Sequence, residues 1–89
     1  MYSNHRLIQL AIAMQDISGI NKLIFIILAS YCDRNDICYP SIQRISIKSG
    51  VSQSSVIRSL NYLDKNKHII RLRGRKYNTT TYQLIIIKE

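Results

Sequence analysis

Hydrophobic positions recur at helical spacing most clearly in the stretch that follows Ser18 and Asn21. Either residue can cap a helix there, and the pattern predicts that this helix runs to about Tyr31. Its apolar face is wide and comprises Ile20, Leu23, Ile24, Ile27, Leu28 and Tyr31. A helix with such a face has to be covered by other elements, so we expect it to form the centre of the core.

Two further helices are predicted between residues 41 and 66. Ser41 can cap the first, Gly50 supplies a backbone that permits a sharp turn, and Ser52 can cap the second. In the second helix the positions predicted to face the core are Val56, Ile57, Leu60 and Leu63. A polar stripe at i, i+3, i+4 and i+7 consists of Ser55, Arg58, Ser59 and Tyr62. Helix, glycine turn and helix in this order are typical of a DNA-binding module.

The segments that flank these helices read as strands. Residues 33–36 form a turn by composition, and a brief strand, Ile37 to Tyr39, follows and ends at Pro40. Ile69 to Arg73 alternates between apolar and polar residues, and Thr80 to Ile87 is rich in β-branched and aromatic residues. With a polar turn between them, the last two segments predict a β-hairpin.

The segment Arg6 to Gln15 is apolar enough to be buried, and its pattern fits a strand and a helical turn about equally; we expect it to be extended. The chain of 89 residues suits one small domain, which buries about 60 to 65% of its unfolded surface. We divide it into an N-terminal arm (1–17), a helix-turn-helix (41–66) and a wing hairpin (69–87). The predicted fold is α+β, a winged helix-turn-helix with a three-helix core, a short strand and a C-terminal β-hairpin wing.

Charge points to a nucleic-acid partner. The formal net charge is +8, from 13 Lys and Arg against 5 Asp and Glu. Seven of the cations are concentrated in one stretch, namely Arg58, Lys65, Lys67, Arg71, Arg73, Arg75 and Lys76, where Asp64 is the single acid. A basic footprint directly behind a helix-turn-helix pattern is the combination that characterises a DNA-binding surface.

The residues expected on DNA are Gln53, Ser54, Ser55, Arg58, Ser59, Tyr62, Arg71, Arg73, Arg75, Lys76 and Tyr77. Arg58 is the candidate for a bidentate contact with guanine, and the hairpin cations suit phosphate. Several positions have an ordinary structural alternative. Tyr62 can pack against the hairpin, and Lys65 with Lys67 can solvate a helix end, where cations also suit the helix dipole.

No other chemistry is predicted. Cys32 and Cys38 have five residues between them, but no second ligand pair follows, so we expect two reduced thiols and no metal. The sequence has no Ser-His-Asp, paired-carboxylate or phosphate-loop pattern, so neither an enzyme nor a cofactor is expected. The longest apolar run, Leu23 to Ala29, is far shorter than the ~20 residues of a membrane helix, and no secretory signal is recognisable. A cytoplasmic location is expected.

With these residues in place, the chain resembles the winged helix-turn-helix domains of phage and plasmid replication initiators and related small regulators. The resemblance covers about Ile20 to Leu84. Its most specific part is the aliphatic segment Leu23–Tyr31, an acidic turn, and the segment Cys38–Ile42 with its aromatic-Pro-Ser order. Two departures stand out. Ile47 occupies a position that is usually polar, and residues 66–68 replace the glycine that commonly ends the recognition helix.

The resemblance implies double-stranded DNA binding, in replication initiation or in transcriptional regulation of a mobile element. Two alternatives stay open: a winged helix used mainly for protein contacts, and a reader of RNA or Z-DNA. A homodimer through Leu7–Met14 and Leu84–Ile87 is a further hypothesis, because three consecutive isoleucines (85–87) put aliphatic side chains on both faces of a strand. Cover within the chain by Ile8, Ile12 and Ile47 is the alternative.

Overall fold

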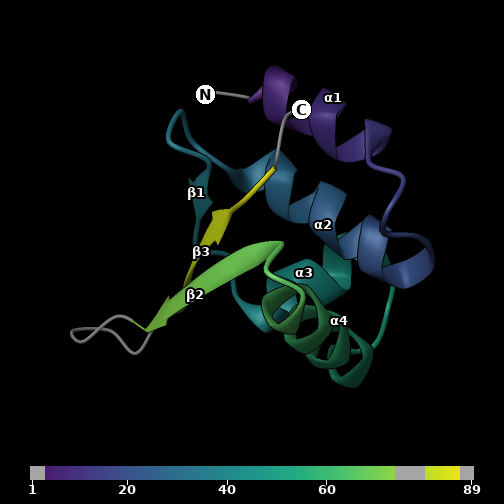
Figure 1. The fold of residues 1–89 in the computed structure, drawn as a ribbon. Helices are drawn as coiled ribbons and strands as arrows, with labels where there is room; N and C mark the ends of the chain where they lie inside the picture. Colours follow the sequence, from purple (N-terminus) through teal and green to yellow (C-terminus); the bar gives the residue numbers. More distant parts are fainter. Residues whose placement is uncertain (1–3, 74–79, 87–89) are drawn as a thin grey trace.

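The computed structural model describes residues 4–73 and 80–86, apart from the side chain of Arg73. The described chain is α+β, with four helices and a small antiparallel sheet (Figure 1). In order, the elements are α1 (His5–Ala13), α2 (Gly19–Tyr31), β1 (Ile37–Cys38), α3 (Ile42–Ser49), α4 (Gln53–Lys65), β2 (Ile69–Arg73) and β3 (Thr80–Leu84).

Helix α2 is the centre of the core, as the sequence predicts. Its buried residues are Ile24, Phe25, Ile27, Leu28 and Ala29. Ser18 is the N-cap residue, although its side chain makes no capping hydrogen bond. The prediction was wrong for Ile20 and Leu23, which are 47% and 40% exposed. Both lie in the first turns of the helix, and Ile20 borders a shallow surface groove beside α4.

The helix-turn-helix forms where the local signals predict it. Oγ of Ser41 accepts a hydrogen bond from the backbone N–H of Arg44 at 3.0 Å, and Oγ of Ser52 accepts one from Ser55 at 3.2 Å. Gly50 ends α3 with φ of 75°, in the left-handed region that glycine adopts without strain. Both predicted serine caps and the predicted glycine turn are therefore confirmed.

The sheet has the order β1-β3-β2, so β3 is the central strand and is antiparallel to both neighbours. Ile37 pairs with Gln83 on one side, and Ile69 pairs with Leu84 on the other. Strand β1 ends one residue before the predicted Tyr39, and β3 ends at Leu84 rather than at Ile87. The predicted turn between β2 and β3 lies outside the described residues, as does Ile87.

The N-terminal segment is a helix, which corrects the expectation that Arg6 to Gln15 is extended. Asn4 caps α1, because its Oδ1 accepts the backbone N–H of Leu7 at 3.0 Å. Leu7 and Ala11 are four positions apart, and both are fully buried in the core. Helix α1 packs on α2, on the side away from α4 (Figure 1). Contact with α2 therefore decides a segment whose own pattern is ambiguous.

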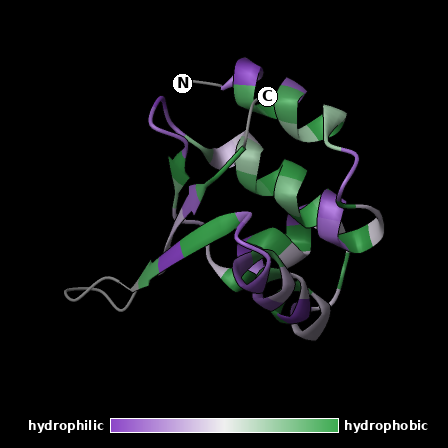
Figure 2. Ribbon diagram, in the orientation of Figure 1, coloured by the Kyte–Doolittle hydropathy of each residue, from purple (hydrophilic) through white to green (hydrophobic). Residues whose placement is uncertain are grey.

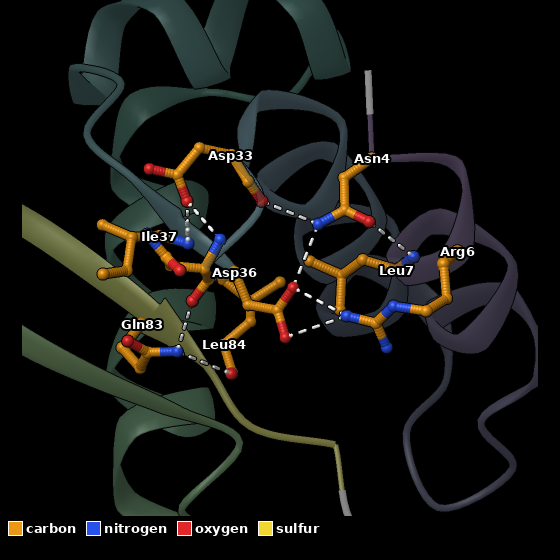
Figure 3. Close-up of polar contacts among 9 residues, drawn as sticks. Asn4, Arg6, Leu7, Asp33, Asp36, Ile37, Gln83 and Leu84 are labelled. Atoms are coloured by element: carbon orange, nitrogen blue, oxygen red, sulfur yellow. Dashed lines mark hydrogen bonds and ion pairs between the residues drawn. The ribbon is translucent and has the colours of Figure 1, made fainter. Parts of the chain in front are cut away.

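A polar network joins α1 to the turn between α2 and β1 (Figure 3). Asn4 is 2% exposed, and its Nδ2 donates to the carbonyl of Asp33 at 2.7 Å and to Oδ1 of Asp36 at 3.0 Å. The guanidinium of Arg6 contacts both carboxylate oxygens of Asp36, at 3.0 and 3.3 Å. The carbonyl of Asp36 accepts the backbone N–H of Leu84 at 3.0 Å. We call this set the Asn4–Asp36 network; it consists of Asn4, Arg6, Asp33, Asp36 and Leu84. The network connects α1, the turn and β3.

Candidate nucleic-acid interface

One side of α4 is buried in the core, so the opposite side of the helix faces solvent. Val56, Ser59, Leu60 and Leu63 are the buried residues of the helix, which packs against α2 and α3. The predicted polar stripe was therefore wrong at Ser59, which is only 3% exposed, because it lies on the same side of the helix as Val56 and Leu63. Ile57, predicted in the core, is 46% exposed. The helix is thus rotated relative to the prediction.

The outward face of α4, as we call it from here, consists of Ser54, Ile57, Arg58, Asn61 and Lys65. All five are exposed and follow each other at intervals of three or four residues, apart from the adjacent pair 57 and 58. Gln53 is also exposed, at the start of the helix. Asn61 and Lys65 were not among the predicted contact residues. Measuring the helical angle from Val56 and Leu60 alone would have found them, because both lie opposite that pair.

Ser55 and Tyr62 lie to one side of this face. With Arg58 and Ser59 they border a shallow groove of about 330 Å³, which Ile20 and Asn21 of α2 complete. Ser55 takes part in the cap, because its Oγ accepts a hydrogen bond from Ser52 at 3.0 Å. Nη2 of Arg58 lies 3.5 Å from the same oxygen, so its guanidinium is near the start of the helix. Tyr62 is 40% exposed.

Arg71 forms an ion pair with Asp64 of the same chain. Its Nε and Nη2 lie 3.2 and 2.8 Å from Oδ2 of Asp64, and the two side chains are 31% and 42% exposed. Because side chains alternate along a strand, Arg71 shares the inner face of β2 with the buried Ile69. Its role as a phosphate contact stays a prediction; in the structure the guanidinium joins β2 to α4.

The other predicted hairpin contacts fall on residues or side chains outside the described part of the chain. Arg75, Lys76 and Tyr77 lie outside the described residues, and the side chain of Arg73 is not described. In Figure 2 the visible side of α4 is mostly hydrophilic, whereas β2 is mostly hydrophobic. On the sheet surface, Ile70 and Leu72 of β2 are 46% and 59% exposed.

Comparison with known proteins decides the family. The model of the helix-turn-helix domain family matches residues 15–69, which is more than half of the chain. The chain belongs to this helix-turn-helix family. The match includes all of α2, β1, α3 and α4, and leaves α1 and β3 outside. No curated protein and no solved structure matches the chain.

A second groove runs between α4 of the helix-turn-helix domain and the sheet. It measures about 350 Å³ and is lined by Ile42, Ile57, Leu60, Arg71, Thr80 and Tyr82. Burial raises the pKa of the Tyr82 hydroxyl, while the positive charge of Arg71 acts in the opposite direction. The phenol is therefore neutral at physiological pH, and Arg71 supplies the one positive charge in this lining.

The two cysteines of the helix-turn-helix domain are buried, free thiols. A hydrogen bond between the two thiols, together with burial, raises the pKa of Cys32. Across residues 4–73 and 80–86, no three His, Cys, Asp or Glu side chains gather where they could hold a metal ion. Nor does this part of the chain contain a helix long and apolar enough to cross a membrane.

Proposed function

We propose that the chain binds double-stranded DNA with α4 in the major groove. The observation that carries this proposal is the chemistry of the outward face of α4. Ser54, Arg58, Asn61 and Lys65 are hydrogen-bonding or cationic, and none is acidic. The one acid of the helix, Asp64, is neutralised by Arg71. A polar, positively charged helix side on a helix-turn-helix scaffold suits base edges and phosphates.

Within this proposal the contacts divide by position. Gln53 and Ser54 at the start of α4 meet phosphate or base edges, and Arg58 donates to guanine. Ser55 and Tyr62 lie beside the outward face of α4, and the buried Ser59 is not among the proposed contacts. Strands β2 and β3 belong to a wing, whose cations Arg73, Arg75 and Lys76 act on phosphate, with Tyr77 beside them.

We further propose a role in replication initiation or transcriptional regulation of a mobile element. The support is the resemblance of Leu23–Tyr31 and Cys38–Ile42 to the winged domains of phage and plasmid initiators. Use of the fold mainly for protein contacts, or for RNA or Z-DNA, is the alternative. Gel-shift measurements with duplex, single-stranded and RNA probes separate DNA binding from these alternatives. Only the proposal of double-stranded DNA binding requires a preference for ordinary duplex DNA.

Arg58→Ala is the sharpest test of the DNA surface. Starting from duplexes selected out of a random pool, we expect the variant to lose about 1 to 3 kcal/mol of binding free energy on the selected site and less on random duplex. Arg44→Ala is the matched control, since it removes the same charge from an exposed position on α3. We expect it to affect both DNAs equally or not at all. If Arg58→Ala binds both DNAs like the parent chain, α4 is not the reading helix.

A further inference from the structure

We propose that Ile57 reads the methyl group of thymine in the major groove, so that the target contains a thymine next to the base pair contacted by Arg58. This inference rests on the proposed function and gives it a base preference. It starts from a side chain that the core does not use. Ile57 is 46% exposed, whereas its neighbours Val56 and Leu60 are 0% and 1% exposed.

The position of Ile57 places it where base edges are read. It lies in the second turn of α4, three residues after Ser54, one before Arg58 and four before Asn61. All three neighbours belong to the exposed outward face of the helix. Any surface that this face meets is therefore also met by the aliphatic side chain of Ile57.

The chemistry of the major groove then identifies the complement. Among the four bases, only thymine presents an apolar group there, its C5 methyl. Ser54, Arg58 and Asn61 pair with donors and acceptors and gain little from a methyl group. An isoleucine cannot hydrogen-bond to a base edge, so it gains only where apolar surface is removed from water. Ile57 next to Asn61, whose amide suits adenine, fits a segment that contains A·T pairs.

Contacts within the chain leave about half of Ile57 exposed. It lines the groove between α4 and the sheet together with Ile42, Leu60 and Tyr82, and 46% of it is still exposed. The other exposed isoleucines of the described chain lie elsewhere, namely Ile12 on α1, Ile20 on α2, Ile47 on α3 and Ile70 on β2. Ile57 is the only exposed aliphatic side chain that α4 carries.

The test replaces thymine by deoxyuridine in the selected duplex, one position at a time, which removes the methyl group and keeps every hydrogen-bonding atom. We expect the parent chain to lose about fourfold in affinity at one or two positions, the factor that follows from one buried methyl-sized group. Ile57→Ala should bind the thymine and deoxyuridine duplexes equally. Ile12→Ala, an equally exposed isoleucine on α1, should keep the full sensitivity of the parent chain.

Three results would overturn the inference: a selected site without thymine beside the guanine that Arg58 contacts, a parent chain indifferent to every deoxyuridine, or an Ile57→Ala chain that still discriminates. The deoxyuridine series uses the parent chain, so the inference stays testable even if Ile57→Ala unfolds. Failure of the proposed function looks different, since the parent chain would then show no preference for any duplex.

Discussion

Exposure of single side chains determines which of the polar residues of α4 can act on a ligand. Three serines of this region have the same chemistry and three different positions. Ser52 caps the helix, Ser55 shares in that cap and is half-buried, and Ser59 is buried. Ser54 differs from all three because its side chain is exposed on the outward face, which is why we propose it as a contact to base or phosphate.

Cys32 allows a prediction about pH. Its pKa is raised by the hydrogen bond with Cys38 and by burial, so the unfolded chain loses the thiol proton at a lower pH than the folded chain does. The associated stability is fully present below the ordinary thiol pKa of about 8.5 and is lost as the pH rises above it. We expect the free energy of unfolding, measured with urea between about pH 8 and 10, to fall more steeply in the parent chain than in Cys32→Ala.

The pKa of Tyr82 is also raised. The stability associated with its neutral phenol is lost only as the pH rises above the ordinary tyrosine pKa of about 10, which is outside the pH range of this experiment. Equal slopes for the parent chain and Cys32→Ala would mean that the thiol pKa is the same in the folded and unfolded states.

At the residue scale, the sequence predicted that α4 has a polar side but not its direction. Counting Ile57 among the core residues moved the predicted stripe roughly a quarter of a turn from the outward face. Hydrophobicity alone could not prevent this, because an isoleucine that contacts a ligand has the same side chain as one that packs in a core. For Arg71 the charge is evident in the sequence, but its pairing with Asp64 is not.

At the scale of elements, the Asn4–Asp36 network yields a prediction about stability. Asn4→Ala removes the cap of α1 and leaves the carbonyl of Asp33 without the Asn4 amide. Because Asn4 is almost fully buried, we expect the free energy of unfolding to fall by about 1 to 3 kcal/mol in urea denaturation. Gln9→Ala, on the exposed side of the same helix, is the control and should stay within about 0.5 kcal/mol of the parent chain. If Asn4→Ala also stays within that limit, the Asn4 contacts contribute little to the stability of the folded state.

The elements that the sequence predicted correctly are those determined locally. Ser41, Gly50 and Ser52 act through bonds or dihedral angles within their own turn, so their effect is legible in the sequence. Helix α1 depends on a cap whose amide reaches residues 33 and 36 and on burial against α2. Such distant contacts cannot be read from ten residues whose pattern fits strand and helix alike.

At the scale of the whole molecule, the outer surface of α1 supports the hypothesis that two copies pair. A groove of about 940 Å³ lies between the end of α1 and the residues after β3, with Leu10, Ala13, Met14, Ile85 and Ile86 as its apolar lining. Ile8 and Ile86 pack against the core, whereas Ile47 is 75% exposed and Ile12 is 51% exposed. Cover of the isoleucines within the chain is thus incomplete.

Sedimentation tests the pairing. We expect the parent chain to sediment as a dimer at high micromolar concentration, and Ala13→Lys to sediment as a folded monomer. Ala13 is suited to this change because it lines the groove but is exposed, so the lysine leaves the core intact. Gln9→Lys adds the same charge to α1 outside the groove lining and should remain dimeric. A monomeric parent chain at that concentration would contradict the pairing hypothesis.

The central place of β3 has a consequence for how the chain is made. In the described part of the chain, β1 and β2 each pair with β3, which follows every other element in sequence. During synthesis the helix-turn-helix leaves the ribosome first, and the sheet can close only once residues 80–84 have emerged. The pairing of β1 with β3 joins distant segments of the chain and forms late, because the loop between them costs entropy before contacts repay it. A newly made chain therefore carries α4, the helix that we propose reads DNA, before its three-stranded sheet is complete.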